Sequence, residues 1–97
     1  MKYQLYVKAE AIQDMAEAFG WYENKRTGLG LEFLDAVEEC YNQITQNPEH
    51  YQYHGDQRIK TMHRFPYKIV YEVEQETIVV YAVYHDKRNP EKLTKRE

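Results

Sequence analysis

The chain has 97 residues, 42% hydrophobic and 30% charged, which is typical of one globular domain and leaves no room for a second core. Its net charge of −3 argues against sequence-independent binding of nucleic acid, although residues 56–97 carry +2 and residues 1–55 carry −5. No apolar run reaches the roughly 18 to 20 residues that a membrane span requires, and the single cysteine excludes an intrachain disulfide.

In the first 25 residues, the spacing of apolar residues changes from that of a strand to that of a helix. Apolar and polar residues alternate from Lys2 to Lys8, which predicts a short, half-buried strand. From Ala9 to about Lys25 the apolar residues recur at helical spacing, and Asp14 is expected on the outer side of this helix.

A second helix is expected from about Leu29, because the glycines at 28 and 30 break the first one. Asn47-Pro48 ends it, since the residue before a proline is disfavoured in the helical region. Cys40 lies on the apolar stripe of this helix and is interpreted as a small buried residue. Two amphipathic helices joined by so short a turn should form an antiparallel hairpin.

The C-terminal half predicts a loop and three strands. Residues 48–57 are polar and aromatic and indicate a loop. Strands are expected over Arg58–Arg64, Tyr67–Glu74 and Thr77–His85, and the last of these is apolar on both faces, as a central strand would be. The charged segment after Asp86 is expected to be loosely ordered beyond about residue 90.

The predicted order is therefore β-α-α-β-β-β, an α+β domain with a helical hairpin packed on a mainly antiparallel sheet. Signatures of nucleotide-binding loops and zinc sites are missing, so we expect no cofactor and no metal. His50 and His54 have the spacing of a metal pair, but this spacing suits a metal only on a helix. The sequence contains no serine, and a cysteine inside a helix is a poor nucleophile, so an enzyme of this sequence would depend on Lys, Arg, His, Tyr or carboxylates.

Arg58, Lys60 and Arg64 have even spacing, so on one extended strand they would project from the same face, with about 7 Å for every two residues along the strand. Such a row suits a phosphodiester backbone or a strip of carboxylates. The alternative is the charged solvent face of an edge strand.

Tyr84, His85 and Arg88 form a second candidate group around the end of the last predicted strand. Side chains from neighbouring strand ends can converge there. The alternative is that Tyr84 packs in the core, His85 caps the strand end, and Arg88 pairs with a neighbouring carboxylate.

An ordered set of short motifs resembles the RelE/ParE superfamily of toxins, and more closely its ParE-like branch. No single motif is specific, but their order and spacing cover nearly the whole chain. The matching pieces are WYE at Trp21–Glu23, GLGLEF at Gly28–Phe33, Asn47-Pro48, Arg58, FPY at Phe65–Tyr67 followed by KIVYEV, and AVYH followed by Arg88 and Pro90.

The resemblance implies the β-α-α-β-β-β fold, a cytoplasmic location and tight binding by a cognate antitoxin protein, whose tail drapes across the toxin. We expect no membrane association and no direct sequence-specific DNA binding. Members of the ParE-like branch inhibit DNA gyrase and are not enzymes, whereas RelE-like members cut messenger RNA on the ribosome without a metal.

Three functions stay open at this point. A gyrase inhibitor is favoured by the HDKRNP ending, which looks like the ParE-like pattern, and by the net charge of −3, since ribosome-directed members tend to be strongly basic. A ribosome-dependent endoribonuclease would use Arg58, Lys60, Arg64, His85 and Arg88 as its catalytic set. The third possibility is an inactive family member that is stable mainly in complex. If the protein acts by binding, the residues expected to contact the target or the antitoxin are these five together with Tyr84.

Overall fold

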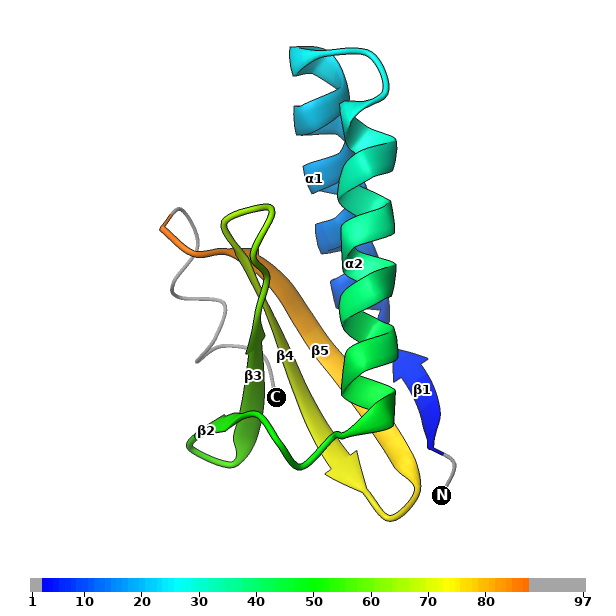
Figure 1. Ribbon diagram of the computed structural model, residues 1–97, viewed down its shortest axis with the longest axis vertical. Coiled ribbons are helices and arrows are strands. Elements are labelled where there is room, and N and C mark those ends of the chain that lie inside the picture. The colour runs from blue at the N-terminus through cyan, green and yellow to red at the C-terminus, as the bar shows by residue number, and fades with distance from the viewer. Residues whose placement is uncertain (1–2, 88–97) are drawn as a thin grey trace.

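The computed structural model describes residues 3–87 and consists of two long helices and a five-stranded sheet (Figure 1). The predicted loose tail beyond Pro90, and Arg88 with it, lie outside the described residues. Within residues 3–87, no helix is long and apolar enough to cross a membrane. The elements in chain order are β1 Gln4–Val7, α1 Ala9–Lys25, α2 Leu29–Gln46, β2 Gln52–His54, β3 Gln57–Thr61, β4 Tyr67–Glu74 and β5 Thr77–His85.

The strand order in the sheet is β1-β5-β4-β3-β2. Only the β1–β5 pair is parallel, and the other three pairs are antiparallel, which confirms the predicted α+β class. β5 lies between β1 and β4, and this central position explains why its sequence is apolar on both faces.

The turn between the helices is fixed by the carboxylate of Glu23. Its two oxygens accept the backbone N–H groups of Gly28 at 2.9 Å and Gly30 at 3.0 Å, which are amides that the start of α2 would otherwise leave unpaired. Gly28 has φ of 90°, a left-handed conformation that favours glycine. At Gly30 a Cβ atom would lie 2.7 Å from the ring of Phe19, so a side chain there would push the two helices apart.

Both helices contribute to one hydrophobic core on one face of the sheet, and in Figure 1 they stand side by side along it. The predicted stripe of α2 is confirmed, since Phe33, Val37, Cys40 and Ile44 are all buried. β4 presents one of its faces to the same core. It contributes to this core, in chain order, Tyr67, Ile69, Tyr71 and the partly buried Val73.

The expectation that Asp14 lies on the outer side of α1 is wrong. Asp14 is 3% exposed, and its carboxylate accepts the backbone N–H of Val83 at 3.0 Å. β1 pairs with β5 only as far as Val80, so the β5 amides beyond that point need another acceptor. As a result α1 is rotated from the predicted position, and Ile12 is 56% exposed.

Two boundaries in the second half also differ from prediction. Residues 52–54 form β2, which the sequence analysis assigned to a loop. β3 ends at Thr61 and not at Arg64, so residues 62–66 connect β3 to β4. β3 is also no edge strand, because β2 pairs along its outer side.

A second, smaller apolar cluster lies on the face of the sheet away from the helices, which we call the helix-free face. Ile59, Val70 and Ala82 form a row across β3, β4 and β5, and Tyr84 packs against the cluster. An irregularity in the β4–β5 register at Val70/Tyr71 shifts the alternation of β5, so that Val80 and Val83 both face the helices.

Candidate functional site

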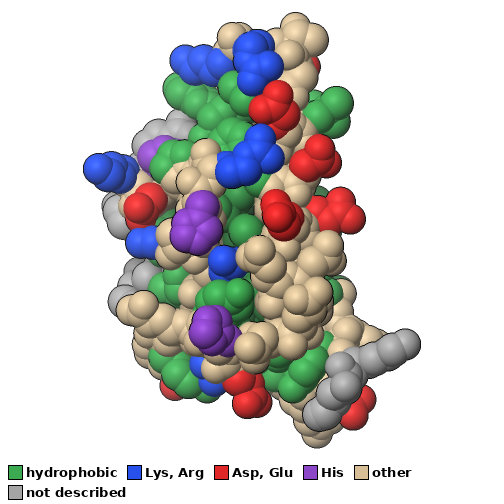
Figure 2. Space-filling view, in the orientation of Figure 1, with side chains coloured by type: hydrophobic (Ala, Val, Ile, Leu, Met, Phe, Trp, Pro, Cys, Tyr) green, Lys and Arg blue, Asp and Glu red, His purple; other side chains and the backbone are tan. Residues whose placement is uncertain are grey.

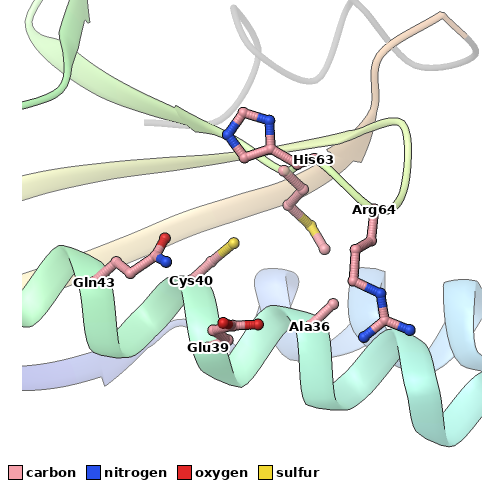
Figure 3. A pocket seen from close by; sticks show the side chains of 7 residues that line it. Ala36, Glu39, Cys40, Gln43, His63 and Arg64 are labelled. Carbon is pink, nitrogen blue, oxygen red and sulfur yellow. The ribbon is translucent and has the colours of Figure 1, made fainter.

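α2 and the segment 60–64 face each other along one side of the molecule, which we call the α2–β3 seam. A pocket of about 240 Å³ opens in it. Figure 3 shows Cys40 and Ala36 directed from α2 toward the segment that carries His63 and Arg64. The pocket is lined by Ala36, Glu39, Cys40, Gln43, Met62, His63 and Arg64.

The floor of this pocket is apolar and its rim is polar. Ala36, Cys40 and Met62 are buried, whereas Glu39 and Gln43 on α2 are exposed. Basic and acidic side chains face each other over this side of the molecule (Figure 2). A pocket of this make-up suits an apolar side chain of a partner, oriented by polar contacts around it.

Cys40 serves the pocket as a packing residue. Burial raises the pKa of its thiol, and this effect outweighs the opposite influence of the Lys60 ammonium. The thiol therefore stays protonated near neutral pH and is a poor nucleophile. The prediction that Cys40 is a small buried residue within a helix is confirmed.

Arg58, the first of the predicted cations, is partly buried and binds groups of the protein itself. Its guanidinium donates to the carbonyl oxygens of Glu49 at 3.0 Å and Tyr51 at 2.8 Å, and to the hydroxyl of Tyr53 at 2.9 Å. The group also lies over the ring of Tyr53, 3.9 Å from its centroid. These contacts hold the segment between α2 and β3 in place, which is a structural use of the charge.

Lys60 projects from the same side of β3 as Arg58, as the even spacing predicts, but it is only 6% exposed. Its ammonium lies over the ring of Tyr51, 4.8 Å from the centroid. Because the whole residue is buried, Lys60 presents little charge to a ligand.

Arg64 is separated from this pair, because the strand ends before it. It reaches across the seam to α2, where its guanidinium lies 3.4 Å from the carboxylate of Glu32. Arg26 binds the other oxygen of Glu32 at 3.3 Å. Since Arg64 and Glu32 are both about half exposed, this pair can be exchanged for contacts with a partner.

Carboxylates surround the surface next to Arg58. A second pocket, of about 360 Å³, has Arg58 in its wall together with Glu49, Asp56 and Glu72. A phosphate that approached Arg58 here would meet three carboxylates and a guanidinium that already donates three hydrogen bonds within the protein. The predicted three-cation row is therefore not present as a continuous phosphate-binding surface.

Tyr84 and His85, the predicted group at the end of β5, lie on different faces. Tyr84 is 4% exposed on the helix-free face, and burial raises the pKa of its phenol. His85 packs edge-on against Tyr67, with ring centroids 5.2 Å apart, and its Nδ1 accepts the backbone N–H of Lys87 at 3.0 Å. The structure thus does not bring the two side chains together.

The sequence reasoning missed the residues that enclose the cations. Tyr51 covers the ammonium of Lys60, and Tyr53 lies under the guanidinium of Arg58. The signal that could have found them is the alternation of aromatic rings with polar residues over 51–54, which is the pattern of a short strand. Glu32, the partner of Arg64, gave no local signal because it lies on another element.

His50 and His54 do not share a helix, since His50 lies after α2 and His54 lies in β2. The geometry that would make their spacing suitable for a metal is therefore absent. Among residues 3–87, no group of three or more His, Cys, Asp or Glu side chains is placed to hold a metal ion.

Comparison with known proteins gives a consistent result. Residues 5–90 match a family described as ParE toxin of the type II toxin-antitoxin system, parDE. Among solved structures, the chain is similar to one from the "Chromosomal ParDE TA system from P. aeruginosa", with a TM-score of 0.77 and 15% identity. That match covers 87% of this chain and 96% of the other. No curated protein matches.

Proposed function

The chain belongs to the ParE toxin family of type II toxin–antitoxin systems, and we propose that it acts by binding, as an inhibitor of DNA gyrase. A cognate antitoxin is the partner that this family implies. The toxin would meet both its target and its antitoxin in the cytoplasm.

The main support for action by binding is that the two cations of β3, Arg58 and Lys60, are used within the protein. A metal-free ribonuclease needs cations that can reach the scissile phosphate and stabilise the charge that develops there. Arg58 is held by hydrogen bonds to Glu49, Tyr51 and Tyr53, and Lys60 is buried against Tyr51. Both residues support the scaffold, which speaks against the RelE-like alternative.

A cleavage assay tests this choice. Ribosomes that carry a defined message are incubated with the purified chain, and primer extension locates any cut. We expect the message to stay intact at a large excess of the chain over ribosomes. Cleavage that disappears in Arg64→Ala or His85→Ala, with the fold unchanged, would establish the nuclease instead.

The α2–β3 seam is the surface that we assign to the antitoxin. Its pocket has the apolar floor and polar rim that suit an apolar anchor on an extended segment that orders as it binds. Arg64 at the rim can exchange Glu32 for a carboxylate of the antitoxin. His85 and Arg88 remain candidates for contact with the target.

A matched pair of substitutions tests the assignment of the seam. Gln43 lines the pocket and its neighbour Asn42 does not, although both are exposed amides on α2. Gln43→Trp should fill the pocket and weaken antitoxin binding about tenfold or more, whereas Asn42→Trp should leave the affinity nearly unchanged. Equal affinities for the two folded variants would place the antitoxin elsewhere.

The antitoxin for this experiment should be encoded beside the toxin gene. We expect the adjacent reading frame to give a short, partly disordered protein with a DNA-binding N-terminal part. Titration calorimetry measures its affinity for each variant, and thermal melting confirms that each variant is folded.

A further inference from the structure

The helical hairpin carries exposed apolar residues on the side that faces away from the sheet. Ile12 is 56% exposed on α1, and Leu31 is 60% exposed on α2. Ala16 and Gly20 follow Ile12 at intervals of four residues and therefore lie on the same side of α1. Apolar residues that are grouped in this way on a surface indicate a contact with another molecule.

The two helices contribute to one continuous surface. Leu31, Asp35 and Glu38 are exposed on the side of α2 opposite to the buried Phe33. The helices stand side by side with the sheet on one side of them (Figure 1). We call their other side the outer hairpin face, and it consists of Ile12, Ala16, Gly20, Leu31, Asp35 and Glu38.

The outer hairpin face is separate from the α2–β3 seam. Glu39 and Gln43 line the seam pocket and so lie on the side of α2 that faces β3. α1 packs on the other side of α2, where the hydroxyl of Tyr41 lies 3.2 Å from the sulfur of Met15. An antitoxin segment in the seam would therefore leave the outer hairpin face open.

Gly20 lies in this face although the fold itself does not require a glycine there. It is inside α1 and is not one of the glycines with positive φ, and no atom lies within 4 Å of a Cβ added to it. Alanine would favour the helix more strongly. A glycine at this position is accounted for if the backbone of a partner approaches α1 closely.

The charge of the face indicates the chemistry of that partner. α2 contains four carboxylates, on Glu32, Asp35, Glu38 and Glu39, and no lysine or arginine. Within residues 3–87, no ion pair involves Asp35 or Glu38. Figure 2 shows acidic side chains gathered along this helix. A second copy bound by a twofold axis would place its own carboxylates against these, so a cationic partner fits better.

We propose that the outer hairpin face binds the protein target of the toxin, through an amphipathic helix that carries lysine or arginine beside its apolar stripe. This inference rests on the proposed function, which gives the toxin a protein target. Ile12 and Leu31 pack against the apolar stripe, and Asp35 and Glu38 bind the basic side chains. From Ile12 to Gly20 the helix rises about 12 Å, which matches just over two turns of a partner helix.

A charge reversal with a matched control tests this surface. Glu38→Lys should raise the concentration of chain that half-inhibits gyrase about tenfold or more, because a cation then faces the basic partner. Its affinity for the antitoxin, measured by titration calorimetry, should stay the same. Glu76→Lys makes the same change of charge at an exposed residue between β4 and β5, and it should alter neither value.

Gly20→Gln separates loss of binding from loss of fold. This variant should melt at least as high as wild type, because glutamine favours a helix and the position is surrounded by open space. It should nevertheless inhibit gyrase about tenfold less, since the added side chain occupies the place of the partner. A weaker inhibitor that is no less stable cannot be explained by unfolding.

Three results would overturn the proposal. If Glu38→Lys and Gly20→Gln inhibit gyrase like wild type while His85→Ala does not, the target binds at the end of β5. If the two variants lose affinity for the antitoxin, the face belongs to the antitoxin. A wild-type dimer in sedimentation that Gly20→Gln dissociates would identify a second copy as the occupant.

Growth arrest on expression of the chain distinguishes a failure of this inference from a failure of the proposed function. Arrest by wild type with intact supercoiling would contradict gyrase inhibition. Relief of that arrest by Glu38→Lys and Gly20→Gln, but not by Glu76→Lys, would still assign the outer hairpin face to the target. Equal arrest by wild type and both variants would overturn the assignment, and a wild-type chain with neither effect would overturn both proposals.

Discussion

The buried carboxylate of Asp14 accepts the backbone N–H of Val83 at 3.0 Å and so joins the first helix to the central strand. The two residues are 69 positions apart in sequence. This contact fixes the rotation of α1 on the sheet, because Asp14 must point inward to reach β5.

Asp14→Ala should therefore destabilise the protein by about 2 to 3 kcal/mol, since it leaves a buried amide without its charged acceptor. Asp14→Asn keeps an acceptor oxygen and should cost less. Urea denaturation followed by circular dichroism measures both. Asn24→Ala, on the exposed side of α1, is the control and should change stability by no more than about 0.5 kcal/mol. Equal stability of Asp14→Ala and wild type would contradict the assigned contact.

Glu23 provides the second prediction, because its two oxygens cap the start of α2 at Gly28 and Gly30. Glu23→Ala removes both acceptors and should cost about 2 kcal/mol, whereas Glu23→Gln keeps one and should cost about half as much. Chemical denaturation gives the two values. A reversed order, with the glutamine variant less stable than the alanine variant, would not fit this geometry.

The two glycines at 20 and 30 give opposite expectations for the same substitution. Gly30→Ala would place a Cβ atom 2.7 Å from Phe19, so it should destabilise by about 1 to 3 kcal/mol. Gly20 lies in α1 with nothing within 4 Å of an added Cβ, and Gly20→Ala should stabilise by up to about 1 kcal/mol through helix propensity. The difference between their melting temperatures is the measurement, and the Gly20 variant should melt higher.

Tyr71 is expected to link stability to alkaline pH. Its hydroxyl donates to the carbonyl of Pro48 at 2.6 Å, and burial raises the pKa of Tyr71 from 10.0 to about 12. Because the folded state holds this proton more tightly, its contribution is complete below pH 10.0 and is lost as pH rises toward about 12.

Tyr71→Phe should cost about 1 to 1.5 kcal/mol at neutral pH. Above pH 10 the free energy of unfolding should fall less steeply with pH in this variant than in wild type. The two slopes should differ by about 1.4 kcal/mol per pH unit, which is the contribution of the Tyr71 hydroxyl. Other tyrosines titrate in the same range, so the informative quantity is the difference between the two pH profiles. Parallel profiles would show that Tyr71 does not carry the linkage.

The sequence predicted most of the fold because the relevant patterns are local. The helical spacing of α1 and α2, the alternation of β4 and the apolar run of β5 can each be seen within one short stretch of the sequence. Asp14 was misplaced because a carboxylate in an amphipathic pattern is ordinarily outside, and the amide that needs it exists only once β1 stops short of Val83. β2 was missed because three polar and aromatic residues carry too little alternation.

The candidate site was harder to predict because its character depends on tertiary contacts. Even spacing correctly placed Arg58 and Lys60 on one side of β3. It could not show that Tyr53 and Tyr51 would enclose them, or that Arg64 would leave the strand and pair with Glu32. Because of these contacts, the cations that were expected to bind phosphate instead stabilise the fold.

Supercoiling of relaxed plasmid by purified DNA gyrase is the measurement that tests the proposed action most directly. We expect the folded chain to stop supercoiling in a dose-dependent manner and an equimolar amount of its antitoxin to restore it. Full supercoiling in the presence of a large excess of folded chain would show that the protein is not a gyrase inhibitor.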